Sequence, residues 1–220
     1  MYKIVIYITM LLSASMMHAQ VAKKSIIMNT NSYSYEVEMN KALQLWENEK
    51  PWEAVTVFEQ ITEIDSEKWL PYYYIAQIHI SSSFTGSDAE ALEMKLEKAQ
   101  VHLDKGMQVS KDNAELFALQ GHLYSAKIVS NPQKYGRALS EKAMRTYTKA
   151  VKLDPENPRV KLAAIEWNIG SAKYLGGSVA SNCEALEKTI ELFTNFKAKE
   201  PFYPTRGKER ALFLQEEYCK

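Results

Sequence analysis

The sequence is poor in the residues that make tight turns. Only eight of its 220 residues are glycine and seven are proline, whereas 13 are tyrosine and nine are methionine. A protein built from many short strands needs turn-forming residues at regular intervals, so their scarcity indicates long helices instead. The composition therefore favours an all-α fold.

The sequence also lacks a net charge. Its 27 Lys and Arg residues balance its 27 Asp and Glu residues, so no overall field attracts the protein to nucleic acid or to an anionic membrane surface. Apolar residues make up 46% of the chain and charged residues 25%, which is typical of a soluble protein with a hydrophobic core. We expect no nucleic-acid partner.

The common catalytic motifs are absent as well. The chain contains no G-x-S-x-G, H-E-x-x-H, P-loop, dinucleotide-binding G-x-G-x-x-G or C-x-x-C sequence. We therefore expect a protein that is not an enzyme and that needs no cofactor.

Three histidines, His79, His102 and His122, fall on predicted helices of consecutive layers. No two of them have the i, i+4 spacing of a helix-borne metal site, and no cysteine lies near them in the sequence, so we interpret them as packing or groove-facing side chains rather than metal ligands. A small-molecule or metal carrier built around these histidines is the alternative hypothesis.

The N-terminus has the layout of a secretory signal peptide. Lys3 precedes an apolar run over residues 4–12, and small and polar residues follow up to Ala19 and Gln20. The run is shorter than the ~20 residues that a spanning helix needs, which disfavours an uncleaved membrane anchor. We predict a signal peptide over residues 1–19, export to the periplasm or another extracytoplasmic compartment, and no stable membrane insertion after cleavage.

Export bears on the only two cysteines, Cys183 and Cys219. An extracytoplasmic compartment permits disulfides, and the two residues are expected at the start of one late helix and at the end of the last helix. They pair if these helices are antiparallel neighbours. Two unpaired thiols are the other reading, because sequence does not fix connectivity.

Residues 20–34 are polar and without periodicity, so we predict a flexible leader there. A helical pattern begins at Tyr35, breaks at Lys50-Pro51 and then resumes, which predicts a helical hairpin. Similar pairs follow along the chain. Aligning their second helices on a small residue gives Ala54, Ala99, Ala143 and Ala185, at spacings of 45, 44 and 42 residues. This near-constant period predicts a repeat domain over residues 35–199.

The third unit resembles the tetratricopeptide repeat. Its second helix reads AMRTYTKAVKLDPENP, and the matching residues of the unit are Phe117, Gly121, Tyr124, Ala143, Tyr147, Ala150 and Pro155. The resemblance implies a right-handed α-solenoid of about four hairpins. Residues 200–220 are then a capping segment, whose final helix covers the last hairpin.

Units two to four depart from that family in carrying inserts of about ten residues between their helices. The inserts read SSSFTGSDAE, SNPQKYGRALS and KYLGGSVASN, and each contains an aromatic residue followed closely by glycine. We expect extended loops on one edge, with glycine supplying left-handed helix caps. The alternative is that the three loops form one shared binding surface.

In tetratricopeptide proteins the first helices of the units line a ligand groove. The resemblance therefore implies an exported scaffold or adaptor that binds a protein or peptide partner through this groove, the alternative being the carrier named above. Of the run Tyr72–Tyr74 in one such helix, we expect one ring to point outwards, because consecutive helical residues face different directions. The groove candidates are Met39, Leu43, Trp46, Tyr73, Gln77, Ile80, His122, Ser125, Leu162 and Glu166.

Overall fold

The computed structural model of the protein describes residues 33–84 and 88–219. Every regular element in these ranges is a helix, which confirms the all-α prediction. None of the helices in these ranges is both long enough and apolar enough to cross a membrane. The predicted signal peptide and the leader up to residue 32 lie outside the described residues.

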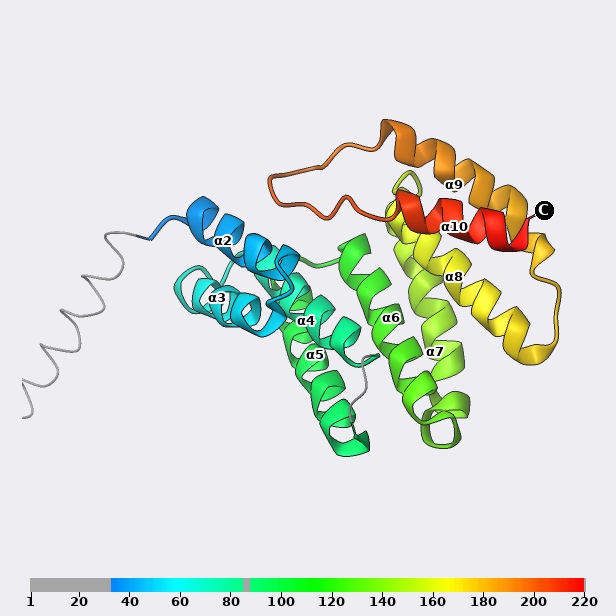
Figure 1. Cartoon of the computed structure of the whole chain (residues 1–220), viewed down its shortest axis with the longest axis horizontal. Coiled ribbons are helices and arrows are strands. Elements are labelled where there is room, and N and C mark those ends of the chain that lie inside the picture. The colour runs from blue at the N-terminus through cyan, green and yellow to red at the C-terminus, as the bar shows by residue number, and fades with distance from the viewer. Residues whose placement is uncertain (1–32, 85–87, 220) are drawn as a thin grey trace, which may run out of the picture.

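The helices follow one another along the chain with short connections (Figure 1). Their bounds are α2 Tyr35–Glu47, α3 Pro51–Ile64, α4 Trp69–Ser82, α5 Ala89–Val109, α6 Ala114–Ser130, α7 Pro132–Leu153, α8 Pro158–Leu175, the 3₁₀ turn η1 Ala180–Asn182, α9 Cys183–Asn195 and α10 Lys208–Tyr218.

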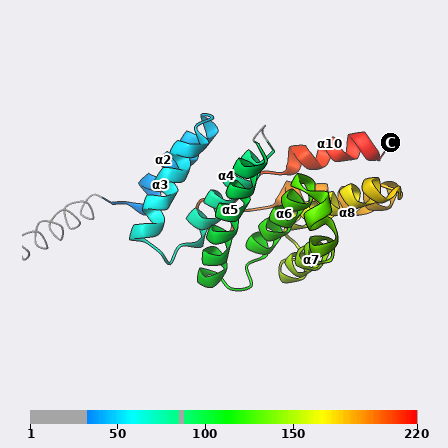
Figure 2. The same ribbon diagram turned by 90° about the horizontal axis from the view of Figure 1, so that it is seen from below.

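Consecutive helices pack as hairpins that lie side by side. Helices α2 and α3, α4 and α5, and α6 and α7 form three pairs, α8 packs on α9, and each pair also contacts the next (Figures 1 and 2). The first helices of neighbouring pairs touch as well, α4 against α6 and α6 against α8. This arrangement places the first helices on a common side of the molecule.

Local sequence signals explain where the helices begin and end. The side chains of Ser34, Asp88, Asn113, Asn131 and Asn157 each accept a hydrogen bond from a backbone N–H in the first turn that follows. Prolines begin α3, α7 and α8, where the missing N–H costs nothing. These caps fix the lengths of the helices and therefore which residues face the common side.

Small residues let the paired helices approach. Ala54, Ala99 and Ala143 are fully buried at these seams, as the alignment of the repeats predicts. The alignment is wrong in the fourth unit, because Ala185 is exposed and Leu186 takes the buried position of α9. In the last unit a buried apolar residue thus recurs near the expected position, but it is the large Leu186 and not a small residue.

The expected edge loops form only in part. Residues 132–140 of the insert SNPQKYGRALS are not a loop but the first turns of α7, because Asn131 caps the helix and Pro132 starts it. Gly136 is therefore a helical residue rather than a cap, whereas Gly176 does end α8 in the left-handed conformation, at φ +72°. Gly86 lies outside the described residues.

The prediction that one ring of Tyr72–Tyr74 points outwards is wrong, because all three are buried. Helix α4 is covered on every side, as expected for a helix that is apolar all round. Part of its cover comes from residues 200–207, a non-helical segment between α9 and α10 that turns at residues 201–202 and that we call the strap. Tyr74 donates a hydrogen bond of 2.6 Å from its hydroxyl to the carbonyl oxygen of Phe202 in the strap. The tail therefore does more than cap the last hairpin.

Candidate functional site

The first helices and the strap line a half-open cavity of about 540 Å³. This volume is within the range of roughly 300–1,000 Å³ that is usual for small-molecule sites. The wall is formed by Leu43, Trp46, Glu47, Tyr73, Tyr74, Gln77, His122, Arg159, Leu162, Ala163, Glu166, Phe202, Tyr203, Pro204, Thr205, Arg206, Gly207 and Arg210. Helices α2, α4, α6, α8 and α10 all contribute to it.

One part of the wall is apolar and aromatic. Trp46 packs edge-to-face against Tyr74, with ring centroids 5.9 Å apart, and Tyr74 stacks in turn on the core residue Phe58. Leu43 and Leu162 extend this surface from α2 and α8. Such a wall favours a ligand with a large apolar face.

The strap is held in place by side chains of the first helices. Besides the Tyr74 contact, Trp69 donates a hydrogen bond of 2.8 Å from its indole N–H to Glu200. Tyr203 is buried, accepts a hydrogen bond from Asn157 and lies edge-on to Trp69. Gly207 has φ +141°, and a Cβ atom there would lie 2.8 Å from Phe193, so only glycine fits. The strap is thus a fixed part of the wall.

A buried ion pair forms the polar floor. The Nε of Arg159 lies 3.1 Å from Oε1 of Glu115, whose side chain is only 2% exposed. The same guanidinium donates to the hydroxyl of Tyr73 at 2.8 Å and to the carbonyl oxygen of Arg206. Although burial alone would lower the pKa of Arg159, Tyr73 and Glu115 raise it overall, so this residue stays charged. Its donors are used to hold the floor and the strap together.

Two further arginines stand at the mouth of the cavity. Arg206 of the strap lies 2.6 Å from Glu47 at the end of α2, and Arg210 in the first turn of α10 lies 2.6 Å from Glu166 on α8. Both arginines are more than half exposed, in contrast to Arg159, and of their partners Glu47 is exposed and Glu166 partly buried. The cavity therefore combines an apolar wall and a polar floor with a charged rim.

His122 lines the cavity from α6 and packs edge-on against Tyr147. Burial lowers its pKa, an effect that Glu166 opposes and Arg159 reinforces. The imidazole is accordingly neutral at neutral pH and keeps a lone pair with which it could bind a metal centre carried by a ligand.

The structure brings seven of the predicted groove residues to the cavity wall: Leu43, Trp46, Tyr73, Gln77, His122, Leu162 and Glu166. Three do not line it. Met39 and Ile80 are buried in the main hydrophobic cluster, and the hydroxyl of Ser125 lies 3.2 Å from that of Tyr147. Tyr73 lies at the floor of the cavity, where its hydroxyl accepts a hydrogen bond from Arg159.

Sequence reasoning missed the arginines and the whole strap. Arg159 lies where α8 begins, and Arg206 and Arg210 belong to the tail, for which the sequence predicts only a capping role. The helical pattern breaks at Glu200-Pro201-Phe202-Tyr203-Pro204. Aromatic residues between two prolines indicate a non-helical segment whose rings need to be buried, so this sequence could have predicted the strap.

The other two histidines lie away from the cavity and form a pair. The rings of His79 and His102 are 6.4 Å apart, and the Nδ1 atoms of both are buried without a hydrogen-bond partner. Burial lowers the pKa of each to about 4. Among residues 33–84 and 88–219, no group of three or more His, Cys, Asp or Glu side chains is arranged to hold a metal ion.

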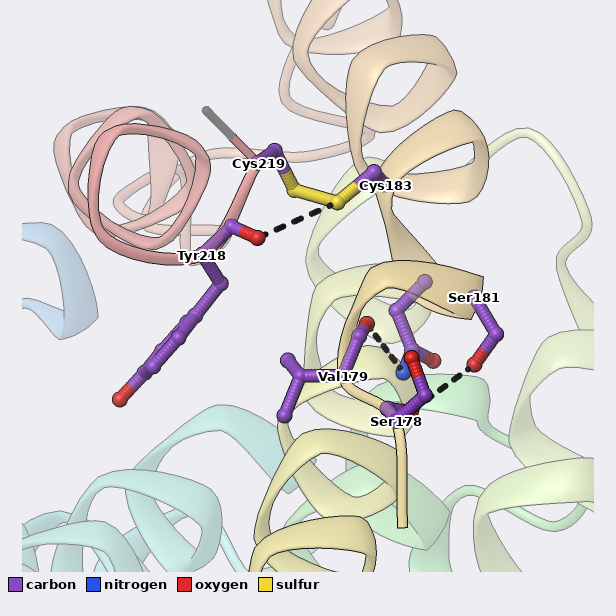
Figure 3. The surroundings of a disulfide bond; sticks show 7 residues. Ser178, Val179, Ser181, Cys183, Tyr218 and Cys219 are labelled. Atoms are coloured by element: carbon purple, nitrogen blue, oxygen red, sulfur yellow. Dashed lines mark hydrogen bonds between the residues drawn. A yellow bond between two sulfur atoms is a disulfide. The ribbon is translucent and has the colours of Figure 1, made fainter.

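A disulfide joins Cys183 to Cys219, with their Cα atoms 5.6 Å apart. Figure 3 shows it linking the start of α9 to the end of α10, beside the turn at Ser178–Ser181. Lys173 donates a hydrogen bond of 2.9 Å to the hydroxyl of Tyr218, which ties the same end of α10 to α8. The helix that follows the strap is therefore anchored at its far end.

In the described residues, fold and site together define a protein of paired helices with an amphiphilic cavity that its own tail covers in part. A solved structure with the same fold is the HusA haemophore from Porphyromonas gingivalis, at a TM-score of 0.73 and 21% sequence identity, covering 86% of this chain and 94% of that one. No family model matches the sequence, and no curated protein does. At this identity the likeness concerns the fold alone.

Proposed function

We propose that this protein is an exported carrier that binds a flat, amphiphilic small molecule of the porphyrin class, such as haem, in the cavity behind the strap. The observation that carries the proposal is the composition of the wall. Trp46, Tyr74 and Leu162 offer apolar surface, while Arg206 and Arg210 stand at the mouth. Porphyrins combine a planar apolar ring with acidic groups on one edge, which is complementary to this arrangement.

The physical chemistry of the wall supports that class of ligand. Aromatic side chains favour offset or edge-on contact with a second ring system, and arginine binds carboxylates through parallel hydrogen bonds. The neutral imidazole of His122 would add a metal ligand if the bound porphyrin carries iron. The shared fold with a protein described as a haemophore is further support.

The structure also bears on the hypothesis that the protein is an adaptor that binds a peptide partner in this groove. The strap is a non-helical segment that contacts α2, α4 and α8, and the resemblance expects a partner peptide to bind along these first helices. The chain thus fills part of that groove itself, and this favours a small ligand in the remaining space.

The decisive experiment is a titration of the purified mature protein with haemin and with metal-free protoporphyrin, followed by visible absorbance and tryptophan fluorescence. We expect saturable binding of both. Trp46→Ala should weaken both, because it removes part of the wall. Trp52→Ala is the matched control, because Trp52 is outside the cavity on α3 and 47% exposed.

His122→Ala provides an internal comparison within the same titration. We expect it to change the absorbance spectrum of bound haemin while leaving metal-free protoporphyrin almost unaffected. Absence of saturable binding of either porphyrin to the wild-type protein would refute the carrier proposal.

A protein partner is a second candidate, supported by a different surface. The ends of α4, α6 and α8 on the insert side expose Phe84, Val129, Tyr174 and Leu175 to solvent. A carrier must deliver its ligand, and an exposed apolar edge suits contact with another protein. Affinity capture with wild-type protein and with a Tyr174→Ser/Leu175→Ser variant tests this. A partner retained equally by both would count against the edge.

A further inference from the structure

The three arginines that line the cavity differ in how firmly their charges are engaged. Arg159 is 17% exposed, and its guanidinium contacts Glu115, Tyr73 and the backbone of the strap. Arg206 and Arg210 are 79% and 53% exposed, and each makes a single ion pair. Only the latter two have charges that another anion could reach.

The carboxylates that these two arginines contact are also accessible. Glu47 is 59% exposed and Glu166 is 27% exposed, and both line the cavity. Exposed ion pairs contribute little to stability, so exchanging one carboxylate for another costs the protein little. Arg210 reaches Glu166 through its Nε, which leaves the outer edge of its guanidinium facing away from that contact. An incoming carboxylate can therefore approach it in the two-bond geometry that arginine favours.

The backbone that carries the two arginines is fixed before any ligand arrives. Arg159 donates to the carbonyl oxygen of Arg206, and Gly207 packs between Phe193 and Leu162. Arg206 directly precedes this glycine and Arg210 follows it in the first turn of α10, so both charges come from one fixed stretch of backbone that lines the cavity. A preorganised pair of cations favours a ligand with two acidic groups on the same edge.

On the basis of the proposed function, we infer that Arg206 and Arg210 form a two-point anchor for the two carboxylates of a porphyrin. In the empty protein Glu47 and Glu166 hold these guanidiniums in position. On binding, the ligand's carboxylates replace the glutamates. Specificity then depends on the acidic edge of the ligand as well as on its ring.

The anchor makes a prediction that ring stacking alone does not. Metal-free protoporphyrin has two carboxylates, and its dimethyl ester has the same ring without the charges. We expect the diacid to bind roughly 10- to 100-fold more tightly than the ester, the range expected for charge-assisted hydrogen bonds. Added salt should weaken binding of the diacid and leave the ester unchanged.

The experiment compares both ligands by fluorescence titration of the full mature protein and of two double variants, each checked for an unchanged circular dichroism spectrum. Arg206→Gln/Arg210→Gln should bind the diacid as weakly as the ester. Glu47→Gln/Glu166→Gln should bind the diacid at least as tightly as wild type, because the competing carboxylates are gone.

Each outcome bears on one proposal. If wild type binds neither ligand, the carrier function fails. If it binds both equally, or if the arginine variant still prefers the diacid, the carrier function stands and the anchor is wrong. If the glutamate variant loses affinity as the arginine variant does, the exchange of carboxylates is wrong.

Discussion

The aromatic ring of Tyr147 occupies the space into which a side chain at Gly121 would project. A Cβ atom at position 121 would lie 2.5 Å from Cε1 of Tyr147. Tyr147 is buried between α6 and α7, and its hydroxyl lies within hydrogen-bond distance of Ser125. The two helices approach this closely only because position 121 has no side chain.

Replacing Gly121 with alanine should therefore destabilise the protein. In an open helix the same change stabilises by about 1 kcal/mol, but here the ring of Tyr147 must move, and overpacking costs about 1–3 kcal/mol. Urea denaturation measures the difference. The control is Gly170→Ala in α8, where a Cβ atom meets nothing within 4 Å and stability should rise. If Gly121→Ala is stabilised as much as Gly170→Ala, the packing of α6 against Tyr147 of α7 is looser than the structure indicates.

Glu115→Gln should destabilise by about 3–5 kcal/mol, because Arg159 would be left buried without its counter-charge. Removal of that pair should also loosen the strap, which Arg159 holds through the carbonyl oxygen of Arg206. Urea denaturation gives the free energy, and protease cleavage within residues 200–207 reports on the strap. Glu184→Gln breaks the exposed pair with Lys188 and should change neither measurement. A stable Glu115 variant with a protected strap would contradict this role.

Loss of the disulfide should lower stability by about 2–4 kcal/mol, since it closes a loop with a sequence separation of 36 residues. The loop contains α9, the strap and α10, so the strap should become easier to cleave in Cys183→Ser/Cys219→Ser. Differential scanning calorimetry with and without reductant tests the first point. Wild type under reducing conditions should match the double variant, and a difference between them would argue against this pairing.

Stability should fall as the pH is lowered from about 6.5 to 4. Burial lowers the pKa of His79 and His102 to about 4, with nearby lysines adding to the effect, whereas the unfolded chain has ordinary histidines. Between these values the unfolded state binds protons that the folded state does not, so acid favours unfolding. Urea midpoints measured across this range should shift less with pH in His102→Gln. If the urea midpoint of His102→Gln changes with pH as steeply as that of wild type, groups other than this histidine pair cause the sensitivity to acid.

The sequence predicted the paired helices well because their signals are either local or periodic. Prolines such as Pro51 act within one turn, and the buried alanines Ala54, Ala99 and Ala143 recur at spacings of 45 and 44 residues. The errors lie where the repeat pattern and the local residues disagree. Asn131 and Pro132 turned an expected loop into the start of α7, and Ala185 was aligned where Leu186 is buried.

The candidate site was predicted only on its helical side. Trp46, Tyr73 and His122 were placed by helix periodicity together with the resemblance, and periodicity says nothing of a segment more than a hundred residues away. The contact between Tyr74 and Phe202 joins positions 128 apart, and the pair of Arg206 with Glu47 joins positions 159 apart. Such pairings depend on tertiary packing, for which one sequence carries no periodic signal.

The order in which the chain is made gives the strap one more consequence. All four first helices precede it in the sequence, so most of the helical side of the cavity is synthesised before the rest of its wall. A chain ending at residue 199 would lack the lining residues from Phe202 to Arg210, and this side of the cavity would have no wall. If the protein is the carrier proposed above, its binding site is therefore completed only by the last segment of the chain.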